Sequence, residues 1–470
     1  MALASLIIPR LIKAYYAMDL PTVRWLVRKV LGHKQRTLLL NKFFSDHAAE
    51  MLDFVPAVSA GCLQTGNQEF RGKHRRTALY TYPFEEVADD SVRTVVFTND
   101  NPFLIEPAPF WGKASPLVSR LIVPLPQIVC TVENGEVEGD CLGVFSKERF
   151  ITMFASAASP HFFEVFSKHD VISWKRMCSF HLTRKTNIIE FDQVVFFASN
   201  GSYADNYFHA LTDAIPSLLA SLDTLSPAEL ARTKVLVPSS LPVAVRQLVD
   251  MIIAFRNIDK IEFGDTSLIR AKRIIVSPYR AQMNDIAASD RISMFHVNAA
   301  DIRKVRQEIW NAIGPDKLST TTEKIFVYLT RANLSSGRRR TINADDVAAL
   351  VKAKGGVVAS PESMTLEHQI ELMGKAKIVI CDAGAAVANA IFCKRETVFL
   401  ILTQRLAKSH LFASYLQALG MRVGFVYGTE VETSYMDPAH FDIVAPINLI
   451  ERAIAFFADE HGHGTPDGWQ

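Results

Sequence analysis

The chain has 470 residues, of which 49% are hydrophobic and 21% are charged, a composition that is ordinary for a globular protein. A chain of this length can form about three domains. The formal net charge of +2, from 51 basic and 49 acidic residues, does not indicate a nucleic-acid-binding protein.

The cysteines and the apolar segments bear on the compartment. Six cysteines are scattered without any Cys-x-x-Cys pair: Cys62, Cys130, Cys141, Cys178, Cys381 and Cys393. This spacing argues against structural zinc or a disulfide framework and favours buried thiols in a reducing cytosol. No apolar run reaches about 18 residues, so no membrane-spanning helix is expected. We also see no secretory signal, because Pro9, Arg10 and Lys13 interrupt the apolar start. The sequence therefore predicts a cytoplasmic protein.

Residues 1–45 are expected to be helical and basic. Between Pro21 and Ser45 there is no acidic residue, while arginines and lysines alternate with large apolar side chains. Such an amphipathic helix can lie on an anionic membrane surface, which would suit an enzyme with a lipid-linked acceptor. It can equally pack on its own protein with a solvated basic face, and we favour this second interpretation.

Residues 46–190 are expected to form an accessory region that contains β-strands. Short β-rich runs occur at Thr94–Thr98 and at Gln127–Val132. The following Glu133–Glu138 has the chemistry of a hairpin, with Asn134-Gly135 as the turn. Nothing in this region indicates what it does.

From residue 191 to residue 315, strands and helices are expected to alternate. The expected elements are a strand at 194–198, a helix at 205–222, a strand at 235–237, a helix at 243–255, a strand at 274–277 and a helix at 300–313. Gly314-Pro315 and the polar run to Glu323 then form the best candidate for a domain boundary.

A second alternating series is expected over residues 323–445. Its expected elements are strands at 325–329, 357–358, 377–381, 398–402 and 423–426, and helices at 344–354, 366–375 and 406–419, with a further helix after the strand at 377–381. Asn343 is the expected N-cap of the first helix and Gly355-Gly356 its stop. A terminal helix at 446–458 and a tail at 459–470 follow.

This alternation predicts an α/β fold made of two doubly wound domains, each with a parallel sheet and helices on both faces. Ligands of such sheets bind beyond the carboxyl ends of the strands. Two such domains in tandem place a ligand cleft between them.

The first candidate site follows the strand at 194–198. In the segment Asp205-Asn206-Tyr207-Phe208-His209, continued to Asp213, the imidazole and the carboxylate are four residues apart. On a helix they share one face. The carboxylate can then fix the tautomer of His209 and raise its basicity, as a general base requires. The alternative is a histidine at a helix start that only bonds backbone.

The second candidate site follows the strand at 325–329. Arg331 stands at the ligand edge of the second sheet, where a guanidinium can hold phosphates by two parallel hydrogen bonds. Of Arg338, Arg339 and Arg340 in the next polar loop, at most one is expected to contact a ligand. Glu367, in the first turn of the helix at 366–375, either faces the cleft or complements the helix dipole.

The third candidate site is the small-residue turn after the strand at 377–381. Gly384, Ala385 and Ala386 carry almost no side chain, so the backbone N–H groups of a helix that starts there could bind a phosphate or pyrophosphate. The alternative is close packing between strand and helix, which also requires small residues. The signal of a Gly-Ala turn is weak by itself.

Several motifs are absent from the sequence. It contains no Gly-x-Gly-x-x-Gly and no Walker motif with its lysine, which argues against dinucleotide oxidoreductases and P-loop enzymes. It also contains no Asp-x-Asp triplet and no metal-type histidine spacing. A metal-chelated nucleotide-sugar site would lack its usual ligands.

Together, these motifs resemble glycosyltransferase family 61. The chain has Asn-Tyr-x-His-x-x-x-Asp, then Tyr-x-x-Arg with Arg-Arg and Asn, then Glu-x-Gln, and finally a Gly-Ala-Ala turn followed by Asn. The resemblance covers roughly Gln193 to Leu402. The family includes plant β-1,2-xylosyltransferase and is similar to the EGF-domain-specific O-GlcNAc transferase and to bacterial enzymes of polysaccharide assembly.

The resemblance implies a GT-B-like fold and an inverting, metal-independent transfer of a hexosyl or pentosyl group from a nucleotide-sugar, UDP-linked or another NDP-sugar, with no cofactor. It implies a glycan or lipid-linked glycan acceptor, as in capsular polysaccharide or lipopolysaccharide assembly. Carried over residue by residue, the acceptor side contains Asn206, Tyr207, His209 and Asp213. The donor side contains Arg331, Arg339, Asn343, Glu367, Asp382, Gly384, Ala385, Ala386 and Asn389.

One departure from the family pattern bears on activity. Where the family has a histidine, this chain has Ala383, and Asp382 before it would place a negative charge near the diphosphate. A non-catalytic member that binds glycan or nucleotide is therefore the main alternative to an enzyme. A membrane-surface scaffold, which rests only on residues 1–45, is another.

Overall fold

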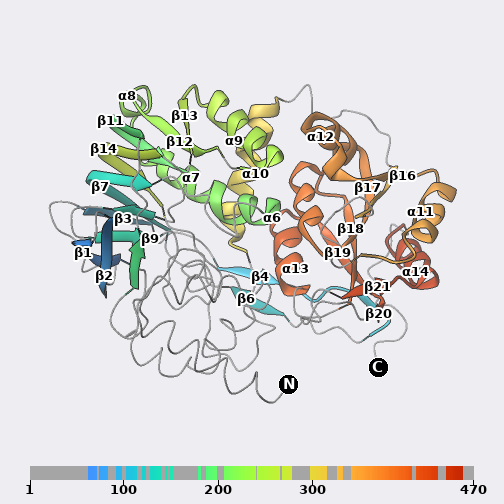
Figure 1. Cartoon of the computed structure of the whole chain (residues 1–470). Helices are drawn as coiled ribbons and strands as arrows, with labels where there is room; N and C mark the ends of the chain where they lie inside the picture. The colour runs from blue at the N-terminus through green and yellow to red at the C-terminus, as the bar shows by residue number, and fades with distance from the viewer. Residues whose placement is uncertain are drawn as a thin grey trace, which may run out of the picture.

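The computed structural model describes two lobes side by side (Figure 1). The described residues are 62–70, 73–82, 92–97, 102–113, 119–122, 127–138, 143–145, 149–152, 178–181, 187–197, 206–239, 241–264, 267–277, 297–314, 325–331, 340–404, 409–431 and 441–458. The predictions for residues 1–45 and 459–470 lie outside them.

The first lobe is built on an 11-stranded mixed sheet. Its parallel part has the order β14-β11-β12-β13, formed by β14 (Ser267–Val276), β11 (Asn187–Phe196), β12 (Lys234–Pro238) and β13 (Asp259–Phe263). The helical segments of this lobe are α6 (Tyr207–His209), η3 (Ala210–Ala214), α7 (Ile215–Asp223), α8 (Pro227–Leu230), α9 (Val243–Phe255) and α10 (Ala299–Ile313). The predicted alternation of strands and helices is confirmed here, but the sheet as a whole is mixed rather than purely parallel as predicted, because antiparallel strands pair with β14.

Antiparallel strands from the N-terminal region extend this sheet. They are β1 (Cys62–Phe70), β2 (Lys73–Tyr82), β3 (Val92–Phe97), β7 (Gln127–Glu138), β8 (Gly143–Phe145), β9 (Arg149–Thr152) and β10 (Cys178–His181). Strand β7 pairs with β14 on one side and with β3 on the other.

The predicted hairpin at Asn134-Gly135 is wrong. Strand β7 runs through both residues, and Gly135 pairs with Ala271 of β14. Asn134 has the positive φ of 51° that its sequence favours, but the chain does not reverse there. A Cβ on Gly135 would lie 2.8 Å from Cδ1 of Ile274. The glycine therefore admits the packed Ile274 side chain rather than a turn.

The second lobe contains a six-stranded parallel sheet of order β16-β15-β17-β18-β19-β5. Its strands are β15 (Ile325–Leu329), β16 (Val357–Ala359), β17 (Ala376–Asp382), β18 (Val398–Thr403), β19 (Arg422–Tyr427) and β5 (Phe110–Trp111). Its helical segments are α11 (Ala344–Ala353), η5 (Pro361–Ser363), α12 (Leu366–Lys375), η6 (Ala385–Phe392), α13 (Ser409–Ala418) and α14 (Ile447–Ala458). The described residues also form two small antiparallel pairs, β4 (Phe103–Ile105) with β6 (Arg120–Ile122) and β20 (Thr429–Val431) with β21 (Asp442–Val444).

Strand β5 links the N-terminal region to the second lobe. It pairs with β19 in parallel, with Trp111 opposite Val426, and the Phe110 ring stacks on Phe425 with centroids 4.6 Å apart. The region from 46 to 190 thus supplies strands to both sheets. The domain boundaries predicted from the sequence stay predictions.

The two lobes share one apolar core. A single cluster of buried side chains includes Val194 of the first sheet and Val379 of the second. Helix α10 lies across the junction (Figure 1), and its Trp310 indole N–H donates to the carbonyl of Ile391 in η6 (3.0 Å). Burial of apolar surface and these bonds hold the lobes against each other.

Two other expectations concern the described residues as a whole. No helix among them is long and apolar enough to cross a membrane. Cys130, Cys381 and Cys393 are buried free thiols, as the sequence predicts for these three. Burial raises the pKa of Cys381 and of Cys393, so both thiols are inert at neutral pH.

Candidate active site

His209 and Asp213 form the predicted pair. The imidazole Nδ1 lies 3.0 Å from Oδ2 of Asp213. The same carboxylate oxygen accepts a hydrogen bond from the Thr212 hydroxyl (2.9 Å). The His209 side chain is 32% exposed, whereas Asp213 is 8% exposed. A buried, hydrogen-bonded carboxylate therefore orients an imidazole that reaches solvent.

The backbone around this pair departs from a regular helix. Residues Ala210–Ala214 form a π-helical segment between α6 and α7. Such π-turns occur within helices mostly as single turns, often at functional sites. Asn206 precedes α6, and its Oδ1 accepts from the N–H of Phe208 (3.0 Å). Asn206 thus acts as an N-cap, a structural role that its assignment to the acceptor side did not anticipate.

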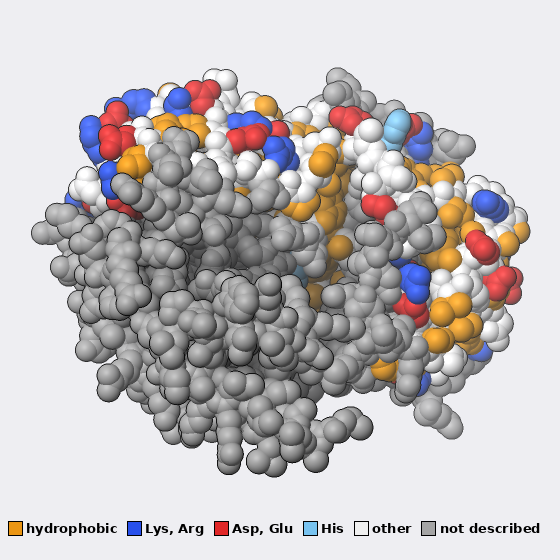
Figure 2. Space-filling model, in the orientation of Figure 1, with side chains coloured by type: hydrophobic (Ala, Val, Ile, Leu, Met, Phe, Trp, Pro, Cys, Tyr) orange, Lys and Arg blue, Asp and Glu red, His pale blue; other side chains and the backbone are white. Residues whose placement is uncertain are grey.

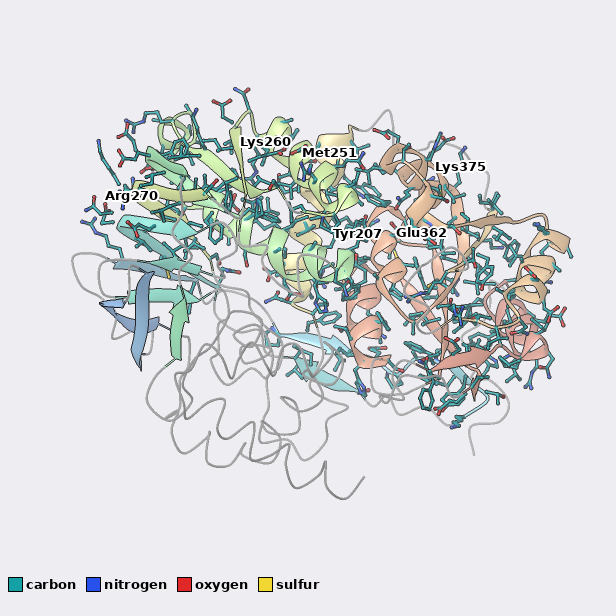
Figure 3. All side chains as sticks on the ribbon, viewed as in Figure 1. Tyr207, Met251, Lys260, Arg270, Glu362 and Lys375 are labelled. Carbon is teal, nitrogen blue, oxygen red and sulfur yellow. The ribbon has the colours of Figure 1, made fainter. Side chains whose placement is uncertain are left out.

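Two aromatic residues of α6 face the second lobe. The Phe208 ring lies 5.6 Å from that of Phe412 and 5.0 Å from that of Tyr415, centroid to centroid. Tyr207 lies at the junction of the lobes (Figure 3). Its buried hydroxyl makes no hydrogen bond to any described residue, and burial raises its pKa. These aromatic contacts fix α6, and with it His209, against the second lobe.

Arg331 and Gly384 lie together on the second lobe. They follow β15 and β17, two neighbouring parallel strands in which Leu329 pairs with Cys381. A Cβ on residue 384 would collide with the Nη1 atom of Arg331. The guanidinium therefore lies directly over the glycine. Its Nε is buried and has no hydrogen-bond partner among the described residues, which is uncommon for a buried polar atom and requires an explanation.

The turn that begins at Gly384 is helical, but not α-helical as the sequence suggested. Residues Ala385–Phe392 form a 3₁₀-helix. In such a helix, side chains three residues apart are eclipsed, and a run rich in alanine tolerates this crowding. The N–H of Val387 donates to the carbonyl of Gly384 (3.2 Å), so the N–H groups of Ala385 and Ala386 precede that bond. The predicted helix N-terminus is therefore present, but it begins a 3₁₀-helix, which is wound more tightly than an α-helix.

Asn389 is enclosed within this 3₁₀-helix. It is 2% exposed, and its buried Oδ1 has no hydrogen-bond partner in the part of the chain that the structure describes. Together with Arg331 Nε, it gives the second lobe an unsatisfied buried acceptor and an unsatisfied buried donor. Such atoms require an explanation, and a bound polar ligand is one.

Asp382 is buried and hydrogen-bonded within the second lobe. Its carboxylate is 2% exposed and accepts from the Thr341 hydroxyl (2.5 Å). Side chains alternate along a strand, so Asp382 shares a face with Ile380, whereas Ala383 joins the core on the opposite face. The charge of Asp382 is therefore directed away from Ala383. Thr341, its partner, carries no sequence signal that would have singled it out.

Asn343 also has a structural task. It precedes α11 but makes no side-chain cap bond. Its amide nitrogen donates to the carbonyl of Ala445 (3.0 Å), and its amide oxygen accepts from the N–H of Ala445 (2.8 Å). Both polar atoms of the side chain are thus used to hold the segment between β21 and α14.

The remaining two donor-side candidates are Glu367 and Arg339. Glu367 is exposed in the first turn of α12, where a carboxylate complements the helix dipole. Arg339 lies outside the described residues. Its neighbour Arg340 binds the buried carboxylate of Asp442 through Nη2 (3.0 Å).

Replacing Asn343 with alanine separates its structural role from the predicted donor role. Losing two hydrogen bonds and leaving the Ala445 N–H unpaired should lower the free energy of unfolding by about 1–3 kcal/mol. Urea denaturation measures this change. Nucleotide affinity should stay the same in the folded variant. A large loss of affinity at unchanged stability would instead show that Asn343 binds the donor.

The two halves of the site meet at the lobe junction. Segment α6, which carries His209, lies against η6, which begins beside Gly384. Arg331 in turn lies over Gly384. An imidazole–carboxylate pair, a guanidinium and a helix start are thereby gathered at adjoining segments of the two lobes. Among the residues that the structure describes, no group of three or more His, Cys, Asp or Glu side chains could hold a metal ion.

Two comparisons with known proteins bear on this site. Residues 207–400 match the sequence model of a family described as Glycosyltransferase 61. This match spans α6 with His209, Arg331 and the Gly384 turn. No curated protein matches the chain.

Proposed function

We propose that this chain, a member of glycosyltransferase family 61 over residues 207–400, is an inverting glycosyltransferase that moves a sugar from a nucleotide-sugar to a glycan acceptor. Membership of the family indicates a glycosyltransferase. The finer assignment rests on one observation: α6 with its His209–Asp213 pair lies against η6, at whose start Arg331 covers Gly384. The two lobes then act as the halves of a GT-B-like fold.

The donor diphosphate binds at the second lobe in this proposal. Arg331 supplies charge-assisted hydrogen bonds to the phosphate oxygens, and its buried Nε gains a partner that no described residue provides. The N–H groups at the start of η6 add the positive end of a helix dipole. These groups stabilise the negative charge that grows on the departing diphosphate.

The acceptor reacts from the first lobe. With Nδ1 of His209 bonded to Asp213, the imidazole takes the proton of the acceptor hydroxyl through Nε2. The acceptor oxygen forms a bond to the anomeric carbon while the bond from that carbon to the diphosphate breaks on the opposite face. The products are an inverted glycoside and a nucleoside diphosphate. The departing charge is neutralised without a bound metal, and no other cofactor takes part.

The donor, the transferred sugar and the acceptor are proposed on the same basis. The donor is UDP-linked or another NDP-sugar, and the transferred unit is a hexose or a pentose. The acceptor is a glycan or a lipid-linked glycan of the kind used in capsular polysaccharide or lipopolysaccharide assembly. Such an acceptor is compatible with a cytoplasmic enzyme that touches the membrane through residues 1–45.

Product analysis tests this function. The protein is incubated with a panel of nucleotide-sugars and oligosaccharide acceptors, with and without EDTA, and the anomeric configuration of the product is determined by NMR. The expected result is transfer with inverted configuration at an unchanged rate in EDTA. A retained configuration would contradict the direct displacement, and loss of activity in EDTA would contradict the metal-independent mechanism.

A further inference from the structure

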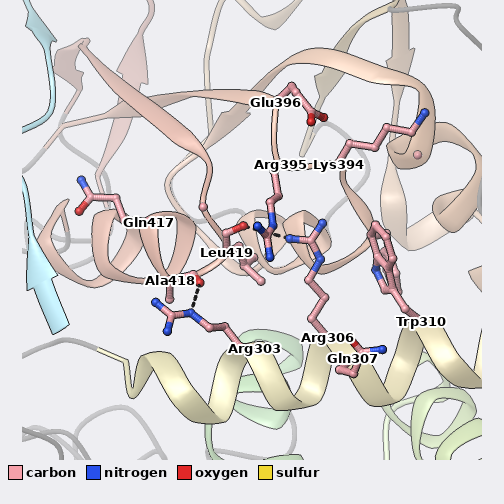
Figure 4. Close-up of a pocket in the computed structure, with 13 residues that line it drawn as sticks. Arg303, Arg306, Gln307, Trp310, Lys394, Arg395, Glu396, Gln417, Ala418 and Leu419 are labelled. Atoms are coloured by element: carbon pink, nitrogen blue, oxygen red, sulfur yellow. Dashed lines mark hydrogen bonds between the residues drawn. The ribbon is translucent and has the colours of Figure 1, made fainter. Parts of the chain in front are cut away.

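A pocket of about 840 Å³ lies between the two lobes (Figure 4). Helix α10 forms one wall, with Arg303, Arg306 and Trp310. The segment before β18 forms the other, with Lys394 and Arg395. A pocket of this size can hold a small ligand such as a sugar phosphate.

The charge of this pocket is strongly positive. Four cationic side chains line it, against the single acid Glu396. Figure 4 shows the guanidinium groups of Arg306 and Arg395 close to each other, with Glu396 pointing away from them. Bringing like charges together costs free energy unless an anion lies between them.

Several cations elsewhere on the first lobe are paired with acids. Figure 2 shows blue and red side chains beside one another over the part of this lobe that holds α9 and β13. Lys260, for example, lies 2.7 Å from Asp250, measured from Nζ to Oδ1. In contrast, Lys394 and Arg395 make no hydrogen bond or ion pair within the described part of the chain. These two cations of the pocket therefore have no acidic partner among the described residues.

The two arginines of α10 are held in place by the second lobe. Arg303 Nε donates to the carbonyl of Ala418 and Arg306 Nη1 to that of Leu419, each at 3.0 Å. Arg306 also donates to the carbonyl of Cys393 and stacks on Trp310, with Cζ 4.4 Å from the ring centroid. Burial, with a contribution from the charge of Arg395, lowers the pKa of Arg306. A bound anion would offset both the desolvation of the Arg306 guanidinium and its repulsion from Arg395. A guanidinium that is already fixed binds a phosphate with little loss of entropy.

We propose that this basic pocket between α10 and the segment before β18 is a second ligand site, which binds a phosphate-bearing anion. Arg395 and Lys394 contact the phosphate from the second lobe, and the N–H groups of Arg303 and Arg306 that are not bonded to carbonyls contact it from the first. Arginine recognises phosphate through paired hydrogen bonds.

The pocket is separate from the proposed donor site. Lys394 and Arg395 precede β18, at the amino edge of the second sheet, whereas Gly384 follows β17 at the carboxyl edge. A strand of this length separates the edges by about 20 Å. The 3₁₀-helix η6 spans the interval, because it begins next to Gly384 and ends at Phe392, which lines the pocket. The proposal does not depend on the proposed function.

Calorimetric titration with inorganic pyrophosphate and, separately, with glucose 1-phosphate tests the site. The titrations use the Arg331→Ala variant, which removes the main phosphate contact of the proposed donor site, at constant ionic strength. We expect binding of at least one of the two probes in this variant. Adding Lys394→Gln and Arg395→Gln should weaken that binding about tenfold or more, because charge-assisted hydrogen bonds are lost.

The matched control removes two charges elsewhere on the second lobe. Lys352→Gln with Lys354→Gln changes two exposed lysines at the end of α11 and should leave the affinity unchanged. Circular dichroism checks that every variant is folded. If neither probe binds, or if the affinity survives the Lys394 and Arg395 substitutions or falls equally in the control, the proposal is overturned.

Discussion

Replacement of His209 with alanine is expected to lower the turnover number by about 10²–10⁴-fold, the usual contribution of one positioned general base. The imidazole is oriented by Asp213 through a 3.0 Å contact at Nδ1, and alanine offers no group that accepts the acceptor proton. Steady-state kinetics at saturating donor and acceptor measure this loss.

Nucleotide affinity serves as the control for this variant. His209 lies on the first lobe, while the proposed phosphate ligands lie on the second, so calorimetric binding of nucleoside diphosphate should be nearly intact. Asp213→Asn should cost less than His209→Ala, because it removes the orienting charge and leaves the imidazole. An unchanged turnover number in His209→Ala would remove this residue from the mechanism.

Replacement of Arg331 with alanine is expected to weaken the binding of nucleoside diphosphate by about 10- to 150-fold. The range corresponds to the loss of hydrogen bonds to a charged group, worth about 1.5–3 kcal/mol. Isothermal titration calorimetry measures it directly. Arg331→Lys keeps the charge but loses the paired geometry, so its affinity should fall between those of the wild type and Arg331→Ala. Equal affinity in all three proteins would refute the donor-side assignment.

Substitution of Gly384 tests the same donor-side assignment by the same affinity measurement. Because a Cβ there would collide with the Arg331 guanidinium, Gly384→Ala should displace that group and weaken binding to a similar degree. Residues that act through one contact are not additive. The double variant should therefore bind about as weakly as Arg331→Ala alone. Additive losses would mean that Gly384 and Arg331 serve the ligand independently.

Much of the fold could be predicted because its signals are local. The predicted bounds of α9, α12 and β15 coincide with those of the structure, since their hydrophobic periodicity is strong. The prediction that the helix ends at Gly355 is also confirmed, because Gly355 lies beyond the end of α11 and has a φ of 72°. The His209–Asp213 pair follows from spacing alone, because a helix brings residues four apart together.

The rest depends on contacts between distant parts of the chain. Nothing near Trp111 indicates that it pairs with Val426, and no local pattern shows that Asn343 bonds Ala445. Asn134-Gly135 has the chemistry of a turn, but pairing of β7 with β14 overrides it. In the candidate site, the topology of neighbouring strands predicts that Arg331 and Gly384 are close. The aromatic contacts of Phe208 that bring His209 to them have no sequence signature.

A crystal structure with bound nucleoside diphosphate tests the central claim most directly. The account predicts that the diphosphate lies against Gly384–Ala386 with its oxygens on Arg331, and that His209 stands across the lobe junction on the side where an acceptor would enter. A diphosphate bound elsewhere, with Arg331 and the Gly384 turn free of ligand, would contradict it.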